Sequence, residues 1–199
     1  MAIDAFMWFQ DYRGAYLRSE SQVTLAKFAG DRDEIVGPYL KAQAAYPPPS
    51  SGLFEVDDYS FDIQQTLNIG SQSSGAGAGK VTFNPFSITR RIDCASPTLF
   101  QMSCSGTPFQ LVGLGLRKSS GGAASGVMVL AFTFKLVAVK TISYVHDDEA
   151  PKETVTFEYG GLCIQYAQQK PDGSLLAPTV GGWDRVHNVA SLDPTKLIT

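Results

Sequence analysis

The sequence is short of charge, and its charges show no basic excess. Charged residues make up 18% of the 199 residues, and the formal net charge is −3. No basic field therefore points to nucleic acid or to an acidic membrane surface as a partner. Cysteines are also few. The number of cysteines is odd, and none forms a Cys-x-x-Cys pair: they are Cys94, Cys104 and Cys163. This pattern favours reduced thiols in a protein made in the cytosol.

Recognisable targeting and membrane-spanning segments are also missing. The opening stretch MAIDAFMWFQDYRG has no basic region and carries Asp4, so we expect no secretory signal peptide. The most apolar run, 127–139, contains Lys135 and is too short to cross a bilayer. We therefore expect no membrane insertion, and any export from the cell has to use another route.

Alternating apolar and polar residues predict an all-β domain spanning 1–199, with about eight strands and one short helix, arranged as a barrel or sandwich. The 127–145 run is longer than an ordinary strand, so we expect it to bend and serve two sheets. Pro85 interrupts the pattern of its strand and indicates a bulge or an edge position. The predicted strands are 3–9, 59–69, 81–92, 109–118, 127–145, 154–169 and 181–189.

Two further segments differ from the strands. Residues 94–106 predict a helix of about two turns, with Ser96 as N-cap, Pro97 at N1 and Gly106 at C′. Residues 12–52 predict a long loop or insertion, because the Pro-Pro-Pro run within it prevents regular structure. A short helix around 38–46 is compatible with Pro38 at a first helical position.

A glycine-rich stretch, GAGAGK, ends in Gly-Lys and raises the question of phosphate binding. A P-loop requires Ser or Thr after the lysine and a helix to follow, whereas Lys80 is followed by Val81 and a predicted strand. We therefore interpret Gly75, Gly77, Gly79 and Lys80 as a pliant connection between two strands.

No residue set predicts catalysis, and we expect no cofactor or metal. There is no G-x-S-x-G nucleophile elbow, and only two histidines are present. The sequence HDDE at 146–149 is typical of a solvated hairpin tip, although His146 with the adjacent acids leaves a metal- or ligand-binding barrel open as an alternative. His187 is interpreted as a structural residue, and Cys104 as core packing.

Four residues are candidates for contacts between subunits. Gly113 and Gly115 leave bare backbone on one face of the 109–118 strand, which suggests close approach by another backbone or subunit. Arg90 and Arg91 are too few for a phosphate-binding stripe, so an ion pair at an interface is the favoured interpretation.

Several motifs, in order and spacing, resemble the Hcp family, the haemolysin-coregulated tube proteins of type VI secretion. The resemblance covers about 130 residues from position 70 onward, together with the opening strand. The matching stretches are MAIDAFMWF, GAGAGKVTFNPFSITRRID, SPTLFQMSCSG, LVGLGLRKSSG, FTFKLVAVKTISY, VTFEYGGLCIQY and GGWDRVHNV.

This resemblance implies a β-barrel of two sheets flanked by a helix, with six copies in a ring and rings stacked into a tube. Expected partners are further copies, a VgrG-type spike, a sheath and small effectors. The protein would be made in the bacterial cytoplasm and secreted through the type VI system. The Gly75–Lys80 loop would meet the next ring. Ser60, Gln64 and Thr66, on a polar strand face, would line the lumen or the outer wall.

Residues 17–52 depart from the family pattern, since they are longer than the usual connection after the first strand. This insertion would affect ring stacking, sheath contact or cargo choice. A phage tail tube subunit remains an alternative with the same fold.

Overall fold

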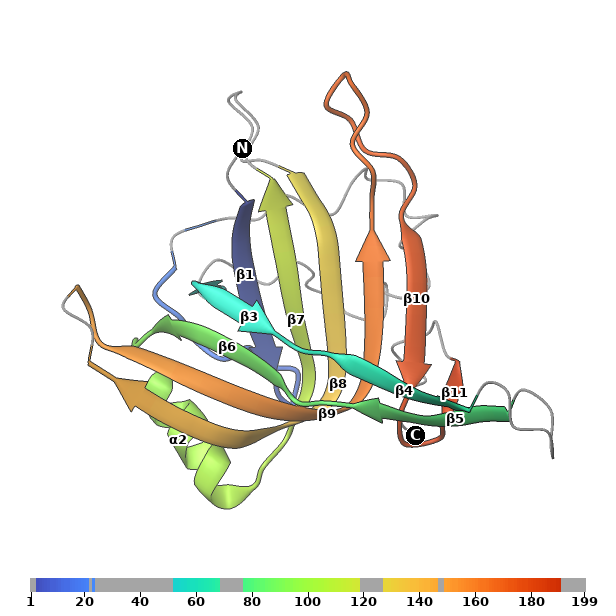
Figure 1. Cartoon of the computed structure of the whole chain (residues 1–199). Helices are drawn as coiled ribbons and strands as arrows, with labels where there is room; N and C mark the ends of the chain where they lie inside the picture. The colour runs from blue at the N-terminus through green and yellow to red at the C-terminus, as the bar shows by residue number, and fades with distance from the viewer. Residues whose placement is uncertain are drawn as a thin grey trace.

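The computed structural model describes residues 3–21, 23, 52–68, 77–118, 127–146 and 149–190. These residues form β-strands and one short helix, as the sequence predicts (Figure 1). The predicted helix around 38–46, and most of the predicted 12–52 insertion, lie outside the described residues. The elements are β1 (Ile3–Gln10), β2 (Phe54–Val56), β3 (Asp58–Ser60), β4 (Ile63–Asn68), β5 (Gly77–Phe83), β6 (Phe86–Arg91), α2 (Ser96–Ser105), β7 (Phe109–Lys118), β8 (Val127–Val145), β9 (Lys152–Tyr166), β10 (Thr179–Asp184) and β11 (Val189–Ala190).

One large antiparallel sheet organises the chain. Its strand order is β11-β10-β9-β8-β7-β1-β2, and a branch runs from β9 to β6 and then to β3. In Figure 1 the sheet forms an upper layer, containing β1, β7 and β10, and a lower layer, containing β6 and the hairpin end of β8 and β9. Strands β4 and β5 pair only with each other among the described strands. We call this pair the ribbon.

The bend between the two layers lies where β8 passes Leu136 and β9 passes Gly160. Lys135 pairs with Gly161 and Val137 with Tyr159, which sets Leu136 opposite Gly160. Leu136 has a positive φ of 48°, and a Cβ on Gly160 would lie 3.2 Å from the Leu136 Cβ. Glycine therefore leaves room for the bend. The predicted bend of 127–145 is confirmed, but β8 passes between two layers of one continuous sheet rather than between two separate sheets.

Aromatic side chains fill the space between the layers. Phe86 of the lower layer stacks on Phe134 at 4.2 Å and on Phe157 at 4.7 Å between ring centroids. Each fully buried side chain of this size contributes about 1.5–3 kcal/mol. Helix α2 closes one end of this core through Leu99, which is fully buried. Packing thus holds a helix that is too short to be stable alone.

Three predicted strands are each divided into two. The break at Pro85 separates β5 from β6, as the interrupted pattern indicated. The predicted 59–69 strand is wrong as a single unit, because residues 61–62 separate β3 from β4. The predicted 181–189 strand is likewise interrupted, since residues 185–188 form a turn between β10 and β11.

The predicted start of the helix also needs correction. Ala95 occupies the N-cap and makes no side-chain cap hydrogen bond, so Ser96 is the first helical residue. The Ser96 hydroxyl is instead used by a buried polar cluster described below. Gly106 ends the helix with a left-handed φ of 67°, which confirms its predicted role.

Candidate assembly surfaces

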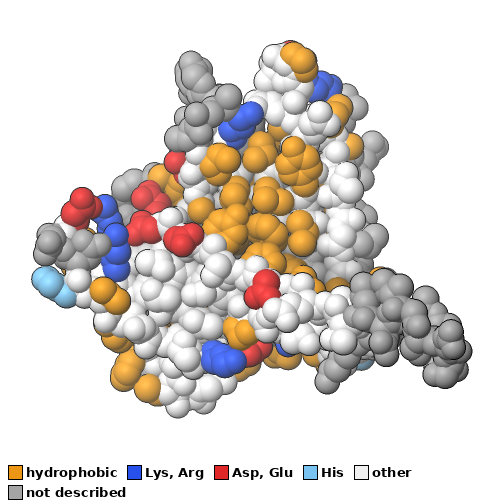
Figure 2. Space-filling model, in the orientation of Figure 1, with side chains coloured by type: hydrophobic (Ala, Val, Ile, Leu, Met, Phe, Trp, Pro, Cys, Tyr) orange, Lys and Arg blue, Asp and Glu red, His pale blue; other side chains and the backbone are white. Residues whose placement is uncertain are grey.

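The front of the upper layer carries an apolar face that the described residues leave partly uncovered. Ala5, Leu116, Leu130 and Tyr166 pair in register across β1, β7, β8 and β9, and Ile164 lies two residues from Tyr166 on the same face. Tyr166 is 50% exposed and Ile164 36%. Figure 2 shows hydrophobic side chains gathered over this part of the sheet. We call these five residues the open face.

The foot of the same face is covered by the chain itself. Strand β3 and the segment that leads from it to β4 cross in front of the upper layer (Figure 1). The Phe61 ring lies 5.2 Å from that of Phe132 and 5.7 Å from that of Phe134, and Tyr59 lies 6.2 Å from Phe132. Aromatic side chains from a crossing segment are therefore one way in which this surface is covered.

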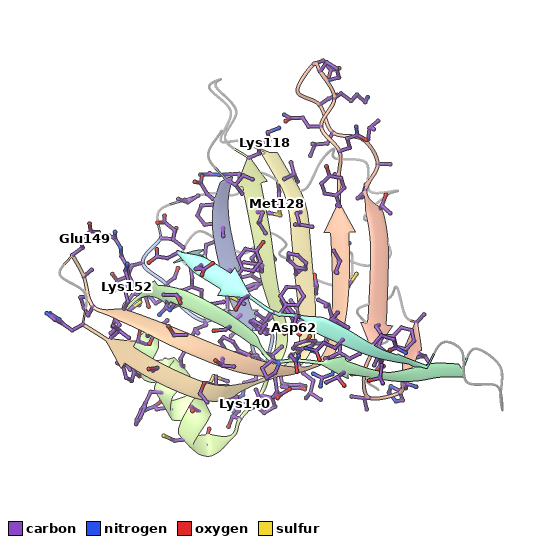
Figure 3. The ribbon with its side chains drawn as sticks, viewed as in Figure 1. Asp62, Lys118, Met128, Lys140, Glu149 and Lys152 are labelled. Carbon is purple, nitrogen blue, oxygen red and sulfur yellow. The ribbon has the colours of Figure 1, made fainter. Side chains whose placement is uncertain are left out.

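The ribbon leaves the foot of the open face and runs past β10 in Figure 1. Its base is fixed by Asp62, whose carboxylate accepts hydrogen bonds from Asn84 at 2.7 Å and from Gln64 at 3.0 Å (Figure 3). Ile63 pairs in register with Phe83, and the Arg185 guanidinium lies 5.3 Å from the Phe83 ring centroid. The ribbon is thus anchored at one end and extends away from the sheet.

A buried polar cluster joins α2 to the lower layer; we call it the Arg90 cluster. Arg90 Nε donates to Glu153 at 2.8 Å, and its Nη2 donates to Asp93 at 2.6 Å and to the Ser96 hydroxyl at 3.0 Å. Ser96 in turn donates to Glu153 at 2.9 Å. The guanidinium also lies 4.8 Å from the Phe54 ring centroid.

This cluster overturns the interface interpretation of one arginine. Arg90 is 2% exposed and Glu153 0%, so the Arg90 ion pair lies inside the subunit. Arg91 is exposed and stays a candidate for contacts between subunits. Sequence reasoning missed Glu153, although the alternation with Val155 and Phe157 places it on the inward face and would have identified it.

The two β7 glycines also have a reason within the chain. A Cβ on Gly113 would lie 2.1 Å from the Trp8 indole, and a Cβ on Gly115 would lie 2.8 Å from the Met128 sulfur. Both glycines are buried. The close approach that the sequence predicted is therefore made by Trp8 and Met128, on the rear of the upper layer. The structure gives no support to a direct contact of these glycines with another subunit.

The remaining predicted assembly residues lie on the surface or in the ribbon. Ser60, Gln64 and Thr66 are exposed, on or beside β3 and β4. Gly77, Gly79 and Lys80 belong to β5, which pairs with β4. These residues therefore form part of a strand rather than a loop. Gly75 lies outside the described residues.

The candidate chemical residues are dispersed. His187 Nδ1 lies 2.6 Å from Asp184 Oδ2, which supports the structural interpretation of His187. Burial alone would raise the pKa of Asp184, but hydrogen bonds from His187 and from the Val186 backbone hold it below its usual value. His146 is exposed, whereas residues 147–148 lie outside the described part of the chain. Among the described residues, no group of three metal-ligating side chains occurs.

The cysteines do not form a common site. Cys104 is exposed, so the prediction that it packs in the core is wrong. Cys163 is buried, and burial raises the pKa of its thiol to about 11. That thiol is therefore protonated at neutral pH and is a poor nucleophile.

A cavity of about 350 Å³ opens between the 11–18 turn and α2. Its lining contains apolar side chains such as Leu17, Met102 and Phe109, with the arginines Arg13 and Arg18, and neither histidine nor cysteine. Asp11 also lines it, and its carboxylate accepts hydrogen bonds from the backbone of Arg13 and Ala15. No described helix has the length and hydropathy needed to span a membrane.

Comparison with known proteins gives one consistent result. The family model described as "Type VI secretion system effector, Hcp" matches residues 48–166, which is more than half of the chain. The protein hcp1 of Pseudomonas aeruginosa is 32% identical over 113 residues, covering 55% of this chain and 68% of that relative.

Solved structures have the same fold. A structure described as that of a type six secretion system protein has a TM-score of 0.72 at 18% identity, covering 96% of this chain and 100% of its own. Hcp1 from Salmonella typhimurium has a TM-score of 0.61 at 21% identity, with the same coverage of both chains.

Proposed function

Since this chain belongs to the Hcp family and is a structural tube subunit of a type VI secretion system, we propose that six copies close into a ring and that rings stack into the tube. The observation that carries the proposal is the match of the family model to residues 48–166. The Hcp family is secreted by the type VI secretion system and is known as a structural protein rather than as an enzyme.

Two features of the subunit favour a ring. Its sheet ends at two short strands, β2 and β11, and its open face leaves Tyr166 half exposed. Ring closure covers strand edges and apolar surface that otherwise promote aggregation. A single subunit in water leaves both unprotected.

The proposal extends to the partners of the tube. Gly75, Gly77, Gly79 and Lys80 contact the next ring, a role supported for the last three by their place in the projecting ribbon. Ser60, Gln64 and Thr66 supply an uncharged polar wall, facing either the lumen or the outside. A sheath surrounds the tube, a VgrG-type spike tips it, small effectors travel in the lumen, and the subunit is made in the bacterial cytoplasm.

Light scattering after size exclusion, with negative-stain microscopy, tests ring formation. We expect a ring-sized particle at micromolar concentration. A strict monomer across protein concentration and salt would contradict the proposal. The phage-tail alternative is not favoured by the family match, and the neighbouring genes test it independently. A type VI sheath gene and an ATPase gene nearby would support the secretion tube, whereas capsid and portal genes would support a phage tail.

A further inference from the structure

We propose that the open face is the docking site for the ribbon of a second copy of this chain. The inference rests on the ring proposed above and names the two surfaces that close it. It assigns the face to a neighbouring subunit rather than to a small ligand.

The open face has the chemistry of a protein interface. Ala5, Leu116 and Leu130 are half-buried, Ile164 and Tyr166 are more exposed, and no charged side chain interrupts them. Lys118 lies two residues after Leu116, and therefore on the same face, at the end of β7 (Figure 3). A contiguous apolar surface with a charged rim is typical of protein–protein contacts.

The chain itself provides a precedent for the occupant. Tyr59 and Phe61 cover the foot of this face by packing on Phe132 and Phe134. The same segment then continues into the ribbon, which runs past β10 and beyond the edge of the sheet (Figure 1). A neighbour lying beside that edge in the same orientation presents its own open face along this path.

The ribbon has an apolar side for such a contact. Ile63 pairs with Phe83, and Gln65 with Val81, so Ile63, Val81 and Phe83 share one face of the ribbon. Phe83 already packs on Tyr159 and Arg185 of its own chain, which leaves Ile63 and Val81 for a partner. The Ile63 side chain is 44% exposed, which is a large exposure for an aliphatic side chain on a strand. An apolar partner surface would cover it.

Each subunit carries both the ribbon and the open face, so the contact needs no other kind of protein. The ribbon and the open face are different parts of the chain, so their contact is head-to-tail, and contacts of this type close into a ring when the rotation between neighbours permits. A tube subunit is surrounded by copies of itself, which supplies the partner at every position.

A matched pair of substitutions tests the face. Tyr166 and Tyr144 are both tyrosines of the β8–β9 hairpin, 50% and 52% exposed, but Tyr144 lies in the lower layer. We expect Tyr166→Arg to abolish the ring-sized particle at concentrations where the wild-type protein is fully assembled, and Tyr144→Arg to retain it. Circular dichroism and thermal unfolding check that both variants fold.

Mixing two variants tests the ribbon. Ile63→Arg alters the ribbon and leaves the face intact, whereas Tyr166→Arg does the reverse. Each variant alone should be monomeric. An equimolar mixture should give a heterodimer and nothing larger, because only the ribbon of the Tyr166→Arg copy and the face of the Ile63→Arg copy remain competent.

The possible outcomes separate this inference from the proposed function. A wild-type protein that never forms rings overturns both. Rings in the wild type that persist in folded Tyr166→Arg overturn the inference alone and leave the face to another partner. Loss of rings in Tyr166→Arg without heterodimers in the mixture overturns the assignment of the ribbon as the occupant.

Discussion

The two layers of this subunit differ in how they are completed. In the lower layer, Phe86 is enclosed by Phe134 and Phe157, and Arg90 has partners from two other segments. In the upper layer, the rear side is buried around Trp8, whereas the front leaves Tyr166 half exposed. The difference indicates that folding of one chain encloses the inner side of the lower layer but leaves the front of the upper layer open, which is the surface that a neighbouring copy covers in the ring proposed above.

The strongest way to break this comparison is to damage the Arg90 cluster. Glu153→Gln removes the carboxylate that pairs with the buried Arg90, and loss of one partner from a buried ion pair costs about 3–5 kcal/mol. Chemical denaturation measures the effect. Glu158→Gln is the control, because Glu158 is 42% exposed in its pairs with Lys140 and Arg185, and exposed pairs contribute about 0–1 kcal/mol. Equal losses in the two variants would refute a special role for the cluster.

A second substitution probes the rear of the upper layer. Gly113→Ala forces a Cβ towards the Trp8 indole, where only 2.1 Å is available, and overpacking of this kind costs about 1–3 kcal/mol. Gly181→Ala is the matched control, since a Cβ there meets nothing within 4 Å. The measurement is the free energy of unfolding of each variant. If Gly113→Ala leaves this free energy unchanged, the Trp8 indole moves aside at no cost and the close packing is not required.

The turn after β10 should add a smaller, pH-dependent contribution. Asp184 accepts hydrogen bonds from the backbone of Val186 and His187, and its pKa lies below the ordinary value of 3.8. A depressed pKa stabilises the fold above the unfolded value, and this stability is lost as pH falls through the folded value. Asp184→Asn should cost about 1 kcal/mol at neutral pH, and the difference from wild type should shrink as pH falls below about 4.

The measurement for this turn is denaturation of both proteins from neutral to acidic pH. A difference that stays constant down to the lowest pH would contradict the assignment to the Asp184 carboxylate.

The smallest effect is expected at the open face. In the isolated subunit, Tyr166→Ser should change the unfolding free energy by no more than about 0.5 kcal/mol, as exposed positions generally do. Denaturation at low protein concentration, where assembly is absent, gives this value. A loss as large as that of Glu153→Gln would mean that the front of the upper layer is already part of the folded core.

Much of the fold was predictable because it depends on local patterns. A nearly continuous apolar run identified β1 and alternation identified β7, each to within one residue, and Pro85 correctly indicated the break between β5 and β6. The bend of β8 followed from its length. The start of α2 was wrong because the Ser96 hydroxyl joins Arg90 and Glu153, which are distant in sequence, and so leaves Ala95 as the N-cap.

The candidate assembly residues were less predictable. Glycine at positions 113 and 115 indicated a close approach, but nothing local to β7 shows that Trp8 and Met128 make it. Arg90 was predicted in an interface ion pair because two arginines are too few for a phosphate-binding stripe, whereas its partner Glu153 comes from β9 of the same chain.

The sequence by itself determined which segments form strands, where helix α2 ends, at Gly106, and the resemblance to a tube-forming family. These depend on side-chain periodicity and on backbone preferences that act over a few residues. Only the tertiary structure decided that Arg90 is internal, that Trp8 occupies the space above Gly113, and that Tyr166 stands on an open face. Burial depends on which distant strands pair and how their layers cross, and this is fixed through space rather than along the chain.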